Sequence, residues 1–106
     1  TLAMANGQYF AAAPLVDPEG HRRGVLFAYQ GEPSWMFLTV GSDPAPGPVT
    51  VELVAHDESV RTVGEDVDLG PESPWGTVIP VAVHEVGLVR VLEGGGAVFA
   101  SARLTP

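Results

Sequence analysis

The sequence predicts an all-β domain in which two antiparallel sheets pack face to face. Turn-forming residues, mainly Pro, Gly, Asp and Ser, recur at short intervals and separate runs rich in Val, Phe, Tyr and Thr. Pro and Gly interrupt every helical period of apolar residues within a turn or two. The chain has 106 residues, a common size for one domain with one core. We therefore expect a single Ig-like β-sandwich of seven or eight strands over residues 1–106.

Eight segments read as strands in chain order. The clearest is 49–56, where apolar residues at odd positions alternate with the polar residues Thr50, Glu52 and His56, as in a half-buried antiparallel strand. The same alternation predicts that Val25, Phe27 and Tyr29 share one face of their strand. Three consecutive glycines at 94–96 predict a tight hairpin, because glycine adopts positive φ without steric cost. The expected strands are residues 9–16, 22–30, 34–41, 49–56, 60–69, 77–83, 87–93 and 97–104.

The connections add two expectations. The long Pro-rich links 42–48 and 70–76 are expected to cross between the sheets, while most other neighbouring strands pair as consecutive hairpins. Gly64 interrupts the apolar alternation within its strand, which indicates a β-bulge.

The strand 34–41 is apolar on both faces. Trp35 and Phe37 share one face, which we expect to be the core because large aromatic side chains dominate packing between sheets. The opposite face then needs a cover, either a segment of this domain or a partner at an exposed apolar patch. Trp75 follows a Pro-containing turn as Trp35 does, so the two indoles either close the ends of the sandwich or share a binding surface. The candidate interaction surface is Met36, Leu38, Val40 and Trp75.

Charge and cysteine content exclude several functions. Thirteen acidic residues against five Arg and no Lys give a net charge of −8, which repels nucleic acids and anionic membrane surfaces. The absence of Cys excludes disulfides, thiolate catalysis and cysteine-ligated zinc. Arg without Lys, together with abundant Ala, Gly, Pro and Val, indicates a bacterial source with a GC-rich genome.

No pattern of catalytic or metal-binding residues is present. His21, His56 and His84 lack the spacing of metal ligands. The serines lack the surrounding glycines of a nucleophile elbow, and no helix or Lys follows the glycines at 94–96 to hold phosphate. We therefore expect no enzymatic activity, no catalytic residues, no cofactor and no metal.

An acidic cluster offers one alternative. Glu65, Asp66, Asp68 and the nearby Glu72 could supply oxygen ligands to Ca²⁺, but they lack the twelve-residue loop pattern. Carboxylates on an edge strand also prevent edge-to-edge aggregation, which is the simpler role.

Nothing in the chain predicts a membrane anchor. No apolar run approaches the roughly 18–20 residues of a membrane span, and no signal-peptide pattern is present. The first residue is Thr1 rather than Met, so we expect a piece of a longer protein.

The order of several short motifs resembles a known family. These motifs are Gly24–Tyr29 (GVLFAY), Gly31–Trp35 (GEPSW), Gly47–Leu53 (GPVTVEL), Trp75–Gly76, Val89–Leu92 (VRVL) and Ala97–Leu104 (AVFASARL). Over roughly residues 15–104 the chain resembles the extracytoplasmic C-terminal β-sandwich region of actinobacterial zinc-finger-type anti-sigma factors and related membrane proteins. In that family a separate cytoplasmic domain binds the sigma factor with His and Cys on a zinc site, and one membrane helix follows. Neither part is in this chain, so no sigma-binding residue is carried over.

The resemblance implies a non-enzymatic sensory or interaction domain on the outer side of the bacterial membrane, within a membrane-anchored regulator of transcription. Its partner would be a protein or a small ligand, and self-association is possible. An alternative is a structural or adhesive Ig-like module of a surface protein or lipoprotein with no regulatory role. A third hypothesis is a small binding or enzyme domain with a site at the strand ends, which a polar-lined pocket near His56 or His84 would favour.

Overall fold

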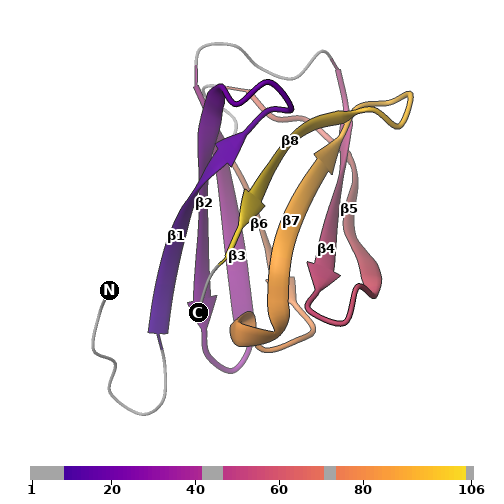
Figure 1. Ribbon diagram of the computed structural model, residues 1–106. Helices are drawn as coiled ribbons and strands as arrows, with labels where there is room; N and C mark the ends of the chain where they lie inside the picture. The colour runs from indigo at the N-terminus through magenta and orange to yellow at the C-terminus, as the bar shows by residue number, and fades with distance from the viewer. Residues whose placement is uncertain (1–8, 42–46, 71–73, 105–106) are drawn as a thin grey trace.

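The computed structural model describes residues 9–41, 47–70 and 74–104, and these residues form eight antiparallel strands (Figure 1). The all-β prediction is confirmed, and the first two strands begin and end where the sequence places them. The single short helix among the described residues is the 3-10 turn η2 (Val83–Glu85). The strands are β1 (Tyr9–Val16), β2 (Arg22–Gln30), β3 (Ser34–Val40), β4 (Val49–Ala55), β5 (Val60–Val67), β6 (Trp75–Ile79), β7 (Val86–Leu92) and β8 (Val98–Arg103).

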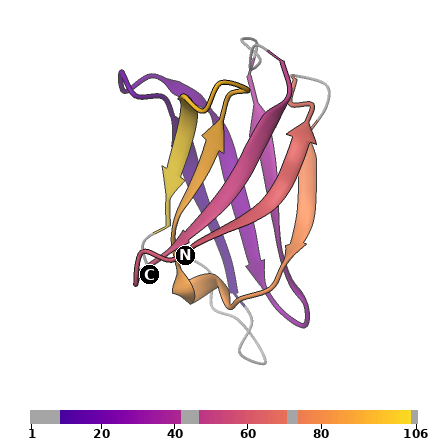
Figure 2. The ribbon, with the colours of Figure 1, turned by 90° about the vertical axis from the view of Figure 1, so that its right-hand side faces the viewer.

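In place of the two separate sheets expected, the strands form one continuous sheet in the order β5-β4-β7-β8-β1-β2-β3-β6. The expected hairpins β1–β2, β2–β3, β4–β5 and β7–β8 are all paired. The pairing between β1 and β8 consists of one residue pair, Val16 with Ser101. This narrow junction joins two four-stranded halves, which we call the β1 half (β1, β2, β3, β6) and the β4 half (β4, β5, β7, β8). The sheet curls so that the halves face each other and nearly close as a barrel (Figures 1 and 2).

The core lies between the inner faces of the two halves. Leu26 and Leu38 of the β1 half have no exposed surface, and neither do Val51 and Val91 of the β4 half. Burial of each such side chain contributes about 1.5–3 kcal/mol relative to full exposure. Residues directly opposite one another on paired strands share a face, so the pairings Leu26–Leu38 and Val51–Val91 extend the core across neighbouring strands.

The orientation of β3 is the reverse of the prediction. Met36, Leu38 and Val40 are 1%, 0% and 6% exposed and form part of the core, whereas Trp35 is 38% exposed on the outer face. The pairing of β2 with β3 places Phe27 opposite Phe37 and Tyr29 opposite Trp35. The aromatic side chains of both strands therefore all lie on the outer face of the sheet.

The two Pro-rich links and the bulge agree with expectation, but the consecutive strands β6 and β7 are not paired, and their connection also joins one half to the other. The connections from β3 to β4 and from β5 to β6 each join one half to the other, as predicted for 42–48 and 70–76, although residues 42–46 and 71–73 lie outside the described part. Opposite β4, the register of β5 skips a residue: Val51 pairs with Gly64, but Glu52 pairs with Thr62. This irregularity confirms the bulge predicted around Gly64.

The sheet closes at one end through an aromatic side chain rather than through hydrogen bonds. A Cβ atom on Gly64 would lie 2.6 Å from Cζ2 of Trp75, so the indole of β6 lies directly on the backbone of β5. Trp75 is partly buried and packs against the core. At the other end β5 and β6 diverge (Figure 2).

The β1–β2 turn is held by a carboxylate. Oδ1 of Asp17 accepts hydrogen bonds from the backbone N–H groups of Glu19 and His21, both at 2.9 Å, and Oδ2 accepts one from Nε of Arg23 at 2.9 Å. The His21 N–H contributes most to holding the pKa of Asp17 below its ordinary value, and the Arg23 guanidinium adds to the effect. Gly20 follows with φ of 89°, a conformation that suits glycine.

Candidate functional site

The outer face of the β1 half carries a row of exposed and half-buried apolar side chains across three strands. Tyr29 of β2 lies opposite Trp35 of β3, and Trp35 lies opposite Val78 of β6. The Tyr29 and Trp35 rings stack with their centroids 5.5 Å apart and their planes 25° apart. Val78 is 56% exposed at the edge of the sheet. The row therefore presents an aromatic stack bordered by an aliphatic edge.

A second row runs beside the first. Phe27 lies opposite Phe37, with ring centroids 6.5 Å apart and a tilt of 42° between the rings. Phe37 lies opposite Gly76, where a Cβ atom would come within 3.0 Å of the Phe37 ring. Glycine at this position lets the ring settle over the β6 backbone, which flattens this part of the face.

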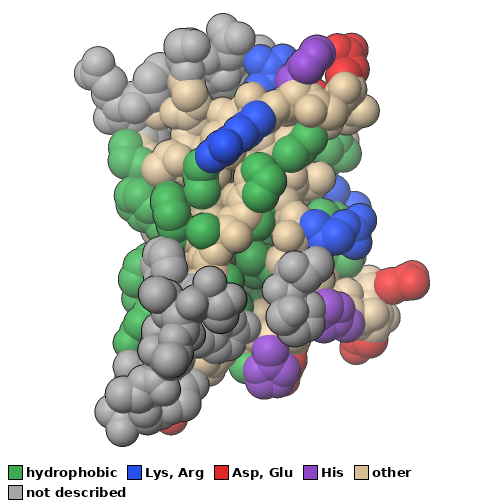
Figure 3. All heavy atoms as spheres, turned by 60° about the vertical axis from the view of Figure 1, so that its left-hand side comes forward, with side chains coloured by type: hydrophobic (Ala, Val, Ile, Leu, Met, Phe, Trp, Pro, Cys, Tyr) green, Lys and Arg blue, Asp and Glu red, His purple; other side chains and the backbone are tan. Residues whose placement is uncertain are grey.

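Apart from Arg23, which precedes Val25 on the outer side of β2 and pairs with Asp17, this face is uncharged, in a chain of net charge −8. Pairing places Ala12 and Pro14 of β1 beside Phe27 and Val25, and Thr39 also pairs with Val25. Figure 3 shows hydrophobic side chains on the side of the molecule that carries β1, with the acidic side chains in view lying toward the ends. We call this surface the aromatic face; it consists of Ala12, Pro14, Val25, Phe27, Tyr29, Trp35, Phe37, Thr39, Gly76 and Val78.

The outer face of the β4 half is different. Glu52 of β4 and Arg90 of β7 pair across the strands, with Nη2 of Arg90 2.7 Å from Oε1 of Glu52 and Nε at 3.0 Å. Thr62 of β5 and Ser101 of β8 are their neighbours in the register. This is an ordinary solvated sheet face, so the lack of charge is particular to the aromatic face.

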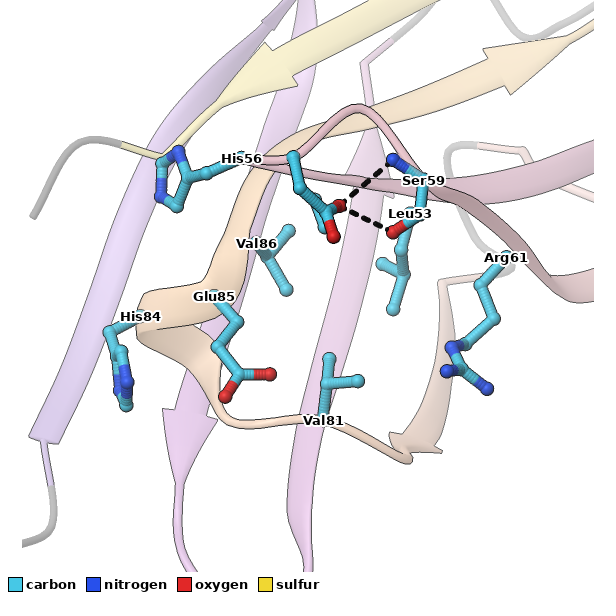
Figure 4. Close-up of a pocket in the computed structure, with 10 residues that line it drawn as sticks. Leu53, His56, Ser59, Arg61, Val81, His84, Glu85 and Val86 are labelled. Atoms are coloured by element: carbon cyan, nitrogen blue, oxygen red, sulfur yellow. Dashed lines mark hydrogen bonds between the residues drawn. The ribbon is translucent and has the colours of Figure 1, made fainter.

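A second feature lies where β5 and β6 diverge. A hollow of about 450 Å³, which we call the strand-end hollow, lies between the β4–β5 turn and the segment that contains η2. Figure 4 shows Leu53, Val81 and Val86 in its middle, with Arg61 and Glu85 on opposite sides of them. Its lining residues are Leu53, Ala55, His56, Asp57, Ser59, Arg61, Val81, His84, Glu85 and Val86.

The polar groups at the hollow do not form a catalytic arrangement. His56 packs over Gly87, where a Cβ atom would lie 3.1 Å from its Nδ1, and His84 lies beyond Glu85 at the margin (Figure 4). Asp57 is engaged by Ser59, whose hydroxyl donates at 2.6 Å and whose N–H donates at 3.0 Å. The hydroxyl contributes most to lowering the pKa of Asp57, so its carboxylate stays ionised above mildly acidic pH.

The predicted site residues lie in other places. Of the candidate surface, Met36, Leu38 and Val40 belong to the core, and Trp75 faces inward against Gly64; these four residues do not form a surface. The sequence interpretation missed Tyr29, Phe27 and Val78 as surface residues. The available signal was that Leu26 and Ala28 offer β2 an equally apolar second face.

The candidate ligands are also dispersed. His21 lies in the β1–β2 turn, 3.6 Å from the Asp17 carboxylate, far along the chain from the strand-end hollow. Glu65 and Asp66 are exposed on β5, and Glu72 lies outside the described residues. Among residues 9–41, 47–70 and 74–104, no three His, Asp or Glu side chains are grouped to hold a metal ion.

No protein-family model, curated protein or solved structure matches this chain. In the part of the chain that the structure describes, no helix has the length and apolar character needed to cross a membrane. The aromatic face and the strand-end hollow are the two candidate binding features of the described residues.

Proposed function

We propose that this chain is a non-enzymatic protein-interaction domain that binds through its aromatic face, and that it serves a membrane-anchored regulator of anti-sigma type on the outer side of the membrane. The observation that carries the interaction role is the uncharged aromatic surface of the β1 half. The anti-sigma assignment and the Ig-like classification of the fold are supported by the order of the short motifs, from GVLFAY at 24–29 to AVFASARL at 97–104.

The chemistry of the aromatic face favours a protein over a sugar. The cores of protein interfaces are enriched in aromatic residues and depleted of charge, as this face is. A sugar-binding platform also needs polar groups that bond to hydroxyls. Here the Thr39 hydroxyl is directed at the backbone oxygen of Val25, at 3.5 Å, which leaves the Tyr29 hydroxyl as the principal polar group among the rings.

The occupant that the charge distribution favours is a second copy of this chain. Two copies that meet elsewhere bring together surfaces of a protein with net charge −8. Copies that meet through the aromatic face place no carboxylate against another, and an apolar surface is complementary to itself under two-fold symmetry. A strongly basic partner would gain nothing from this face, because the face offers no anion.

The test is the oligomeric state of two matched variants. Val78 and Val60 are both exposed valines on edge strands, at 56% and 51%, but Val60 lies outside the aromatic face on β5. In sedimentation equilibrium we expect a concentration-dependent dimer for the native chain and for Val60→Asp, and a monomer for Val78→Asp. A native chain that stays monomeric up to about 1 mM, where an interface worth about 4 kcal/mol would be half formed, overturns the self-association.

The regulatory assignment is tested in the parent protein. A Cys- and His-bearing cytoplasmic segment followed by one membrane helix, upstream of Thr1, is the expected arrangement; a signal peptide directly upstream contradicts it. In cells, Val78→Asp in the full protein should change the output of a sigma-dependent reporter, whereas Val60→Asp should not. Equal output from both variants would favour a structural or adhesive module.

A further inference from the structure

We propose that the strand-end hollow binds a small zwitterion with an apolar middle, such as an ω-amino acid or a short peptide, with Arg61 receiving its carboxylate and Glu85 its ammonium group. This site is separate from the aromatic face, and it develops the hypothesis of a binding site at the strand ends. Four observations lead to it.

The hollow is a consequence of incomplete closure of the sheet. Trp75 fills the space between β5 and β6 at one end by lying on Gly64, and the strands separate toward the other end (Figure 2). Leu53 and Val86, which are 3% and 2% exposed, are core residues that form its floor together with Val81. A volume of about 450 Å³ falls within the range of small-molecule sites, about 300–1,000 Å³.

Arg61 occupies an unusual position for a cation. It lies directly opposite Leu53 in the β4–β5 register, so its side chain is on the inner side of the sheet. Leu53 belongs to the core, but Arg61 is exposed because β6 diverges from β5 at this end of the sheet. Its guanidinium forms no ion pair with any described residue, so it is available to a carboxylate, which it can bind through two parallel hydrogen bonds.

Glu85 supplies the opposite charge across the floor. It belongs to η2, and Figure 4 shows its carboxylate beside Val81, on the other side of the hollow from Arg61. Within the described chain this carboxylate also has no ion-pair partner. The two charges are too far apart to pair with each other, and an apolar surface lies between them. A ligand with both charges and a short hydrocarbon middle matches this arrangement.

Both walls of the hollow are fixed before a ligand arrives. Oε1 of Gln30 accepts a hydrogen bond of 2.7 Å from the backbone N–H of Val83, which anchors η2 to the end of β2. The backbone N–H of His56 donates to the carbonyl of Glu85 at 3.2 Å, which ties the β4–β5 turn to η2. A preformed site loses less entropy on binding.

The simplest competing explanation is that Arg61 only protects the edge of β5. An inward-pointing charge on an edge strand prevents pairing with another chain. That role needs no Glu85 and no zwitterion, so the two explanations predict different binding results.

The experiment uses 6-aminohexanoate as the probe, with hexanoate and hexylamine as single-charge controls, in ¹H–¹⁵N NMR titrations of the whole chain. We expect saturable shifts confined to residues 53–61 and 81–87, and about five-fold weaker binding of either control, the loss expected for one exposed ion pair. Equal binding of all three compounds, no shift up to tens of millimolar, or shifts elsewhere would overturn the proposal.

Variants separate the roles of the two charges. Arg61→Gln and Glu85→Gln should each weaken 6-aminohexanoate binding about five-fold, while the distant Arg103→Gln should retain it. Circular dichroism checks that each variant is folded, which is expected because both side chains are exposed. If Arg61→Gln binds the probe as the native chain does and only aggregates more, Arg61 is an edge-protecting residue and the proposal fails.

Discussion

The orientation of β3 is best tested by truncating one residue from each of its faces. Leu38 is fully buried and lies opposite Leu26. Leu38→Ala removes buried methyl and methylene groups and leaves a cavity, which costs about 2–5 kcal/mol. Trp35→Ala removes a larger side chain, but one that is 38% exposed. Its main specific contact is the stack on Tyr29, and such a pair contributes about 0.5–1.5 kcal/mol beyond its area.

The assay is urea unfolding followed by circular dichroism at low protein concentration, where any association is weak. Against a typical stability of about 5–15 kcal/mol, Leu38→Ala should lower the midpoint strongly and the melting temperature by roughly 10–20 °C. Trp35→Ala should lose less free energy of unfolding, because more than a third of its surface already lies in solvent. If Trp35→Ala loses more than Leu38→Ala with an unchanged urea m-value, the aromatic side chains form the core and the aromatic face does not exist.

Two further predictions concern closure and pH. Gly64→Ala should destabilise the fold by about 1–3 kcal/mol, because the new Cβ would lie 2.6 Å from the Trp75 ring. The intensity and wavelength of tryptophan emission from the native state should also change. A variant with unaltered emission and unaltered stability would contradict the packing of Trp75 on Gly64. Asp17, whose pKa is lowered by the His21 N–H and by Arg23, contributes stability above its unfolded pKa of 3.8 and loses it as pH falls through the lower folded value. The difference in free energy of unfolding between the native chain and Asp17→Asn should therefore be constant near neutrality and shrink below about pH 4, and a difference that grows on acidification would refute the sign.

The number of the strands could be predicted because local chemistry sets them, and so could their positions except that of β6, which spans Trp75–Ile79 rather than 77–83. Pro or Gly follows each run except β4, which ends at a turn of Asp57 and Ser59, and the three glycines at 94–96 form the expected hairpin, in which Gly96 has φ of 94°. The bulge at Gly64 was also readable, since a glycine within an interrupted alternation marks irregular pairing. Each of these features depends on residues within a few positions of one another.

The choice of inner face could not be made locally. Residues 35–38 are apolar at every position, so their alternation fits either orientation. The register between β2 and β3 ties Tyr29 to Trp35 and Phe27 to Phe37, which makes the choice collective: all four rings point inward or all point outward. Which face points inward depends on the volume of the space between the two halves of the sheet, and the sequence of a single strand carries no information about that volume.

The strand-end hollow could not be predicted from the sequence, for a related reason. Arg61 and Glu85 are 24 positions apart, and they approach one space because β5 and β6 close at Trp75 and separate beyond it. The sequence hypothesis named His56 and His84 as markers of such a site. Both line the hollow, but its charge arrangement rests on Arg61 and Glu85 instead.

A binding role requires that the residues of the aromatic face contribute more to association of the chain than to the stability of its folded monomer. An exposed indole stabilises the monomer less than a buried one, because part of its apolar surface stays in water whether or not the chain is folded. If the face exists to bind a second copy, Trp35→Thr, which keeps a good strand-forming residue, should leave the folded monomer largely intact and abolish the dimer. Association that persists in this variant would place the interface elsewhere, while a chain that unfolds would show that the indole belongs to the core.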